Sequence, residues 1–112
     1  MNLRRFCSSI AFALGPVLLG GCQSNLSSSA PPITASFIRA SLRENGDAGT
    51  LAQGRTLFLN RCILCHALPE VTRFDAPRLT VIVAKMSGRA NLKPEQHEAV
   101  LKYLLTVRSQ QL

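Results

Sequence analysis

Two cysteines and a histidine occur together in the stretch Cys62-Ile63-Leu64-Cys65-His66, and this stretch decides what kind of domain the chain can form. Two thiols separated by two residues lie about one helical turn apart, so both can react with the same planar ligand. The histidine that follows the second thiol can lie beneath that ligand and bind a metal at its centre. The spacing therefore predicts a covalently attached, metal-containing cofactor.

The pattern C-x-x-C-H is the attachment signature of haem c, in which the thiols form thioether bonds and the histidine binds the iron. We therefore expect one haem c, held by Cys62 and Cys65, with His66 as the proximal iron ligand. A zinc site would need a second pair of ligands, and beyond His66 the sequence offers only His97 and no further cysteine. A thioredoxin-like redox pair would need strands around it, and no strand pattern is visible.

Helical patterns flank the motif on both sides. Asp47 or Thr50 can cap a helix that runs to about Arg61, directly before the motif. Near the end of the chain, Pro94 lies in the first turn of another helix. The apolar stripe of that helix has helical spacing and consists of Val100, Leu101, Leu104 and Val107. The sequence predicts an all-α fold of three to four short helices around a covalently bound haem, over residues 47–112.

Residues 54–105 resemble a compact class I cytochrome c domain. Gly54 and Phe58 match the glycine and the aromatic residue of that family's N-terminal helix, which crosses the C-terminal helix closely. Tyr103-Leu104 stands where the family often has Tyr-Leu, and the middle segment is similar to short bacterial variants reading C-x-x-C-H-x-L…W-x-x-x-V-x-x-M…Y-L. This chain has Leu79 in place of the tryptophan. The resemblance implies one-electron transfer, with iron cycling between Fe(II) and Fe(III).

Met86 is the first candidate for the second axial ligand of the iron. It lies on the apolar face of a helix expected over residues 77–86, and the short-variant resemblance also places a methionine there. That face has the spacing i, i+3, i+4 and i+7 and consists of Leu79, Ile82, Val83 and Met86. Filling the core is the alternative role for a methionine. His97 is a second candidate ligand, and a vacant position is the third possibility.

The formal net charge is +7, from 13 basic and 6 acidic residues. A basic surface favours an acidic redox partner, with a simply solvated face as the alternative. The basic residues are spread out, few aromatic residues lie between them and no reader motif is present, so we expect no nucleic-acid partner. Arg73 and Arg78, in the segment after the motif, are candidates to pair with the haem propionates or to be solvated.

Residues 1–21 have the layout of a secretory signal peptide. Arg4 and Arg5 precede an apolar run from about Ile10 to Leu19, and small residues follow. The run is shorter than the roughly 20 residues of a membrane-spanning helix, so we do not expect it to span a membrane.

Leu19-Gly20-Gly21-Cys22 resembles the lipobox of bacterial lipoproteins, which implies that Cys22 is acylated and becomes the new N-terminus. Cleavage near Gly21 as an ordinary signal peptide, or an uncleaved anchor, is the alternative. In lipoprotein sorting an aspartate after the cysteine retains some proteins at the inner membrane, and Gln23 therefore favours the outer membrane. The Ser- and Pro-rich residues 22–46 are expected to form a flexible linker.

The sequence shows no nucleophile–base pair, carboxylate dyad or phosphate loop, so we expect no enzyme. The expected function is a one-electron carrier in the bacterial cell envelope, facing the periplasm. Two alternatives are a haem-based sensor or minor peroxidase with an open sixth position, and a haem subunit of a membrane-bound oxidoreductase.

Overall fold

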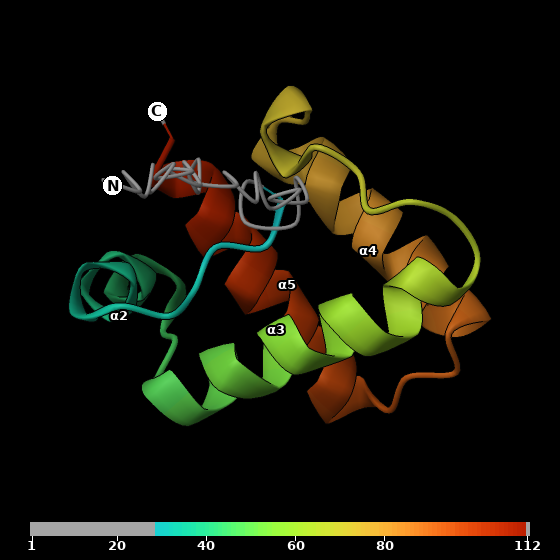
Figure 1. Ribbon diagram of the computed structural model, residues 1–112, viewed down its shortest axis with the longest axis horizontal. Helices are drawn as coiled ribbons and strands as arrows, with labels where there is room; N and C mark the ends of the chain where they lie inside the picture. Colours follow the sequence, from blue (N-terminus) through green and yellow to red (C-terminus); the bar gives the residue numbers. More distant parts are fainter. Residues whose placement is uncertain (1–28, 112) are drawn as a thin grey trace, which may run out of the picture.

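The computed structural model describes residues 29–111, and within this range every regular element is helical (Figure 1). The α-helices are α2 (Ala35–Ser41), α3 (Ala48–Arg61), α4 (Ala76–Arg89) and α5 (Pro94–Ser109). Three single-turn 3₁₀ helices join them: η1 (Leu42–Glu44), η2 (Cys62–Leu64) and η3 (Val71–Arg73). The prediction of an all-α fold is confirmed for these residues. The expected signal peptide (1–21) and Cys22 lie outside the described range.

No helix in the described part of the chain is both long enough and apolar enough to cross a membrane.

Side-chain caps set the starts of α3 and α4. Asp47 caps α3, because its Oδ1 accepts hydrogen bonds from the amides of Gly49 (2.9 Å) and Thr50 (3.0 Å). The hydroxyl of Thr50 also donates to this carboxylate, and these contacts hold the pKa of Asp47 below its usual range. Asp75 caps α4 by accepting from the amide of Arg78 (2.8 Å). Of the two proposed caps for α3, Asp47 is therefore the residue used.

The crossing of α3 over α5 depends on Gly54. A Cβ atom at this position would lie 2.7 Å from the carbonyl carbon of Ala99 and 2.8 Å from Cβ of Tyr103. Both distances are far shorter than a normal carbon–carbon contact, so only glycine lets the two helices approach this closely. Figure 1 shows α3 and α5 crossing in the middle of the domain.

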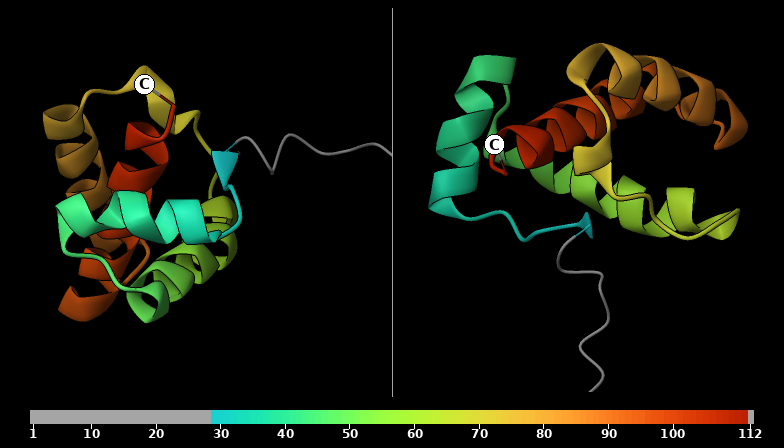
Figure 2. Two further views of the ribbon diagram at one scale, coloured as in Figure 1. Left: turned by 90° about the vertical axis from the view of Figure 1, so that its left-hand side faces the viewer. Right: turned by 90° about the horizontal axis from the view of Figure 1, so that it is seen from above.

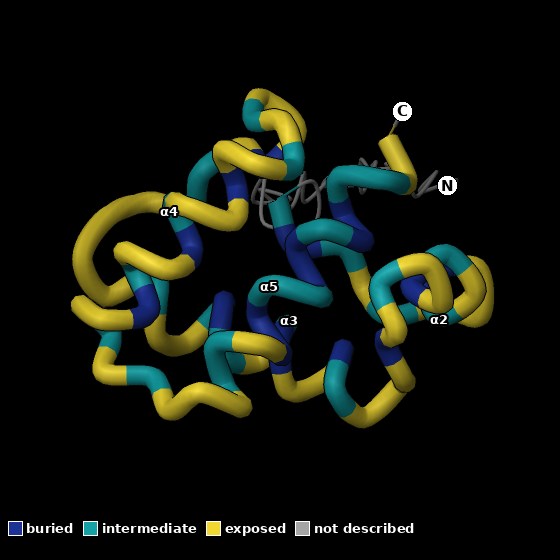
Figure 3. The backbone as a smooth tube through the Cα atoms, turned by 180° about the vertical axis from the view of Figure 1, so that it is seen from behind, coloured by how far each residue is buried: buried dark blue, intermediate teal, exposed yellow. Residues whose placement is uncertain are grey.

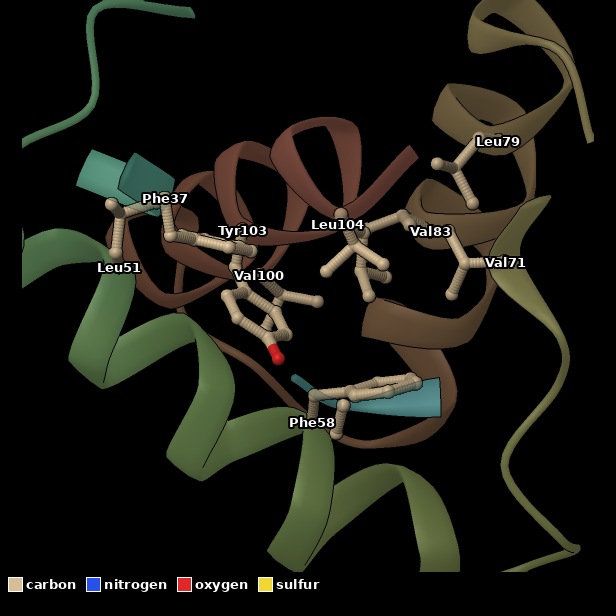
Figure 4. Close-up of a cluster of buried hydrophobic side chains, with 11 residues drawn as sticks. Phe37, Leu51, Phe58, Val71, Leu79, Val83, Val100, Tyr103 and Leu104 are labelled. Atoms are coloured by element: carbon tan, nitrogen blue, oxygen red, sulfur yellow. The ribbon is translucent and has the colours of Figure 1, made fainter. Parts of the chain in front are cut away.

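An aromatic cluster forms the centre of the core. The ring of Tyr103 lies 5.4 Å from that of Phe37 on α2 and 6.3 Å from that of Phe58 on α3, and both pairs are tilted. Figure 4 shows these rings with the aliphatic side chains around them, and Figure 3 shows buried positions turned toward the interior of the bundle. The aliphatic members of this core are Ala30, Leu51, Val71, Leu79, Val83, Val100, Leu104 and Val107.

Residues 30–46 belong to the folded domain, so the expectation of a flexible linker through residue 46 is wrong for this part. Phe37 is completely buried, and α2 packs against α5 at one end of the domain (Figure 2). The hydroxyl of Tyr103 donates to the carbonyl of Pro31 (2.8 Å), and the guanidinium of Arg55 donates to the carbonyls of Pro31 (3.1 Å) and Ala30 (3.2 Å). Burial of the apolar surface of Phe37 stabilises the folded form of this segment, although its Ser and Pro content predicted a linker.

Candidate functional site

The cysteine–histidine motif lies at the carboxyl end of α3. The chain passes from α3 directly into η2, so Cys62 begins a further helical turn instead of leaving the helix. Cys62 is half-buried, whereas Cys65 and His66 are exposed. Burial raises the pKa of the Cys62 thiol, and the charge of Cys65 adds to this effect. The helical continuation keeps both thiols and the imidazole within a short stretch on one side of the domain.

A cavity of about 290 Å³ opens beside this motif. Its walls come from the end of α3, the loop that contains η3, the inner face of α4 and one side of α5. The lining is mainly apolar, and Figure 4 shows several of its side chains gathered from these separate elements. The apolar lining residues include Phe58, Val71, Phe74, Leu79, Ile82, Val83, Leu92, Val100 and Leu104. Mainly apolar walls with a few polar groups are typical of a cofactor pocket, and the volume is close to the roughly 300 Å³ at which such pockets begin.

The cavity brings together the residues that the sequence singled out. Cys62, Cys65 and His66 line it from the end of α3, and Met86 lines it from α4. Met86 is half-buried and shares its helix face with the buried Leu79 and Val83, as the i, i+3, i+4, i+7 spacing predicts. The helix itself starts at Ala76 and extends to Arg89, three residues beyond the expected end.

The imidazole of His66 is oriented by its own backbone surroundings. Its Nδ1 lies 2.7 Å from the carbonyl oxygen of Ala67. A carbonyl oxygen only accepts hydrogen bonds, so this contact requires the proton on Nδ1. In the neutral imidazole, the other ring nitrogen, Nε2, then keeps its lone pair and is the nitrogen able to bind a metal.

The side chain of His97 contacts a residue of α4 instead of lining the cavity. Its Nδ1 lies 2.8 Å from the hydroxyl of Ser87, across the packing of α4 on α5. Ser87 lines the cavity, whereas His97 is not one of the lining residues. The structure therefore groups Met86, and not His97, with the cysteine–histidine motif.

The two arginines proposed as propionate partners lie away from the cavity walls. Nε of Arg73 pairs with a carboxylate oxygen of Glu70 at 2.7 Å, with both side chains largely exposed, and Arg78 is exposed on the first turn of α4. Arg61 and Arg89 line the cavity instead. Neither was predicted as a site residue. Arg61 ends α3 directly before Cys62, and Arg89 ends α4 three residues after Met86. These positions in the sequence are the signal that identifies them.

Arg61 also joins two of the walls. Its Nη2 donates to the carbonyl of Ala90 at the end of α4 (2.9 Å), so the end of α3 is tied to the end of α4 across the cavity rim. Among residues 29–111, the only ion pairs within 4.0 Å are Arg73–Glu70 and Lys102–Glu98. Arg61 and Arg89 therefore bring uncompensated positive charge to the cavity.

No group of three or more His, Cys, Asp and Glu side chains in the described range is placed to hold a metal ion.

No known family, curated protein or solved structure matches this chain significantly. The motif, the cavity and the helix crossing are the features of this chain that bear on its function.

Proposed function

We propose that this protein is a small monohaem c-type cytochrome that carries single electrons in the bacterial cell envelope. The observation that supports this most strongly is the shared cavity, which is lined by Cys62, Cys65 and His66 from one element and Met86 from another. Two thiols, an imidazole and a thioether are the groups that attach and ligate haem c.

The residues present fit that cofactor. Cys62 and Cys65 would hold the haem by thioether bonds, and His66 and Met86 would bind its iron. The proton on Nδ1 of His66 leaves Nε2 available for this role, and the apolar lining suits a large hydrophobic ring. When bound, the haem supplies an iron that accepts and returns one electron.

The helix crossing supports the same proposal. In the class I cytochrome c family, a glycine of the N-terminal helix allows a close crossing with the C-terminal helix. Gly54 occupies such a crossing here, with Ala99 and Tyr103 of α5 against it. The sequence resemblance at this position thus coincides with a geometric need for glycine.

The chain's own residues would tune and direct electron transfer. The apolar walls would reduce the contact of a bound haem with water, and a thioether ligand from Met86 would give a higher reduction potential than a second histidine. Arg61 and Arg89 place positive charge beside the cavity, which would speed encounters with an acidic redox partner at low salt. The expected signal peptide would direct export of the chain, and lipidated Cys22 would hold the domain on a membrane, facing the periplasm, with the outer membrane favoured over the inner.

Absorption spectra of the purified full chain, oxidised and reduced, test this proposal. We expect a low-spin haem, with the weak long-wavelength band of a ferric iron–methionine bond in the oxidised protein. Met86→Ala should abolish that band while leaving the haem covalently bound. Cys62→Ala combined with Cys65→Ala should remove covalent haem, measured by haem-dependent peroxidase staining after denaturing electrophoresis.

Three results would contradict the proposal in different ways. A chain without covalent haem after expression with a haem c assembly system would exclude a c-type cytochrome. A high-spin spectrum that changes on addition of carbon monoxide would indicate an open sixth position and favour the sensor or peroxidase alternative. Purification from membranes as part of a stable complex would favour the oxidoreductase-subunit alternative.

A further inference from the structure

The outer surface of α2 and η1 carries two arginines and an exposed leucine next to one another. Arg39 and Arg43 are four residues apart and Leu42 is three residues from Arg39, so the three side chains are neighbours on one helical face. Leu42 is 66% exposed, although leucine is a residue usually found in cores. The opposite side of α2 is fixed by the buried Phe37, which keeps this face turned outward (Figure 3).

A shallow groove runs along the same face. It is lined by the side chains of Ser36, Arg39, Ala40, Arg43 and, from the end of α5, Ser109. The two guanidinium groups are donors suited to phosphate oxygens, whereas the hydroxyl of Ser109 already donates to the carbonyl of Thr106 (2.9 Å). Within residues 29–111 neither arginine forms an ion pair, even though Glu44 follows Arg43 directly.

The start of the folded domain lies close in sequence to the expected lipid anchor. Ala30 is completely buried and its carbonyl is held by Arg55 at 3.2 Å, so the domain begins there. From Cys22 to Ala30 the chain advances eight residues, which span at most about 28 Å when fully extended. A linker through residue 46 would have given roughly three times that reach. An acylated Cys22 would therefore keep the domain near the headgroups of its membrane.

We propose that the face formed by Arg39, Leu42 and Arg43 is a membrane-contact surface that binds anionic lipid headgroups. The arginines meet the phosphates, and Leu42 enters the boundary between headgroups and acyl chains. This inference rests on the lipid anchor of the proposed function, but not on the haem.

The arrangement of the helices gives the contact a consequence. Figure 1 and the right-hand view of Figure 2 both place α2 at one end of the domain, and α4 with the carboxyl end of α3 at the other. Since Cys62 and Met86 line the cavity from these two elements, membrane contact through α2 would turn this side of the cavity toward the aqueous phase. A partner approaching from the periplasm could then reach it.

Tryptophan fluorescence tests the contact, because the chain contains no tryptophan of its own. The full lipidated chain carrying Leu42→Trp is reconstituted into vesicles of phosphatidylcholine alone, or of phosphatidylcholine and phosphatidylglycerol in equal parts. Each composition is prepared with and without brominated acyl chains, which quench tryptophan at the membrane interface. The matched control is Val81→Trp, at a position on α4 that is 65% exposed and lies at the other end of the domain.

We expect bromine quenching for Leu42→Trp in the phosphatidylglycerol vesicles, little in phosphatidylcholine alone, and none for Val81→Trp in either. Arg39→Gln and Arg43→Gln should each lower the equilibrium constant for contact, calculated from the quenching, by about fivefold, the factor expected for one basic side chain near an anionic surface. Unchanged circular dichroism would show that these surface variants are folded.

Vesicle flotation separates failure of the contact from failure of the anchor. If the chain floats with the vesicles but bromine quenches Leu42→Trp as little as Val81→Trp, the membrane contact is refuted and the lipid anchor is not. The face would then be solvated or bind an acidic protein. A chain that does not float with phosphatidylglycerol vesicles would refute both. Neither result bears on the haem, which the absorption spectrum tests independently.

Discussion

The same substitution, glycine to alanine, should have opposite effects at two helical positions of this protein. At Gly54 in α3, the added methyl group would overlap the backbone of Ala99 and lie 2.8 Å from Cβ of Tyr103. At Gly88 in α4, a Cβ atom would meet nothing within 4 Å. Alanine is favoured over glycine in a helix by about 0.8–1 kcal/mol, and this gain is available at both positions.

The net effect is set by what the methyl group displaces. Overpacking a well-packed core costs about 1–3 kcal/mol and sometimes more, and at Gly54 the obstacle is helix backbone, which moves only if α5 moves. We therefore expect Gly54→Ala to lower the free energy of unfolding by about 2 kcal/mol after the propensity gain, and Gly88→Ala to raise it by about 0.5–1 kcal/mol. For a domain of this size, 1 kcal/mol corresponds to roughly 4–8 °C in Tm, so the two variants should differ by more than about 10 °C.

Thermal unfolding of the purified full chain, followed by far-ultraviolet circular dichroism, measures this difference. Neither glycine lines the cavity, so cofactor content should be equal in both variants and is checked by absorbance. A Gly54→Ala variant as stable as Gly88→Ala would show that α3 and α5 do not cross as closely as the structure has them.

Two further predictions concern the aromatic cluster. Phe37→Ala should lower the free energy of unfolding, measured by chemical denaturation, by about 3–5 kcal/mol, because Phe37 is fully buried against Tyr103. A loss below about 1 kcal/mol would show that the packing of α2 does not stabilise the domain. Burial raises the pKa of Tyr103 to about 12, against the opposing effect of the Arg55 guanidinium. Since folding favours the neutral phenol, stability should be intact below the ordinary tyrosine pKa of about 10 and should decline as the pH rises from there toward 12. Tyr103 is the only tyrosine, so an ultraviolet difference titration reports it alone, and a midpoint near its ordinary pKa would contradict the buried placement.

Local patterns in the sequence were sufficient to predict α3, α4 and α5, but not α2. The i, i+3, i+4, i+7 spacing placed Met86 on the same face as Leu79 and Val83, and that face forms a wall of the cavity. Asp47 was one of two proposed caps, and it is the one whose side chain accepts hydrogen bonds from backbone amides of α3. In both cases the residues that form the pattern and the residues that they contact lie within one or two helical turns of each other. Over this range the spacing of side chains along a helix is informative.

Contacts between distant segments were not predictable in the same way. Tyr103 and Pro31 are 72 residues apart, and Arg55 and Ala30 are 25 apart, yet these pairs fix where the domain begins. The Ser and Pro content of this segment favours a linker, whereas a few apolar residues, with the fully buried Phe37 among them, dock it on the core. The position of Arg61 directly before Cys62 was visible in the sequence, but its contact with Ala90 across the cavity rim, 29 residues away, was not.

Neighbouring side chains of α5 meet different kinds of surroundings, and this difference bears on function. Tyr103 packs against α2, where the ring of Phe37 lies against its own ring and protein atoms complete the core. Val100 and Leu104, three residues before Tyr103 and one after it, line the cavity between the end of α3 and the inner face of α4. A cofactor held there would touch all three helices, so its binding would stabilise the packing of α4 as well as supply redox chemistry. A small domain that builds part of its core from a covalently attached group needs fewer large side chains of its own, and only 5% of the residues here are aromatic.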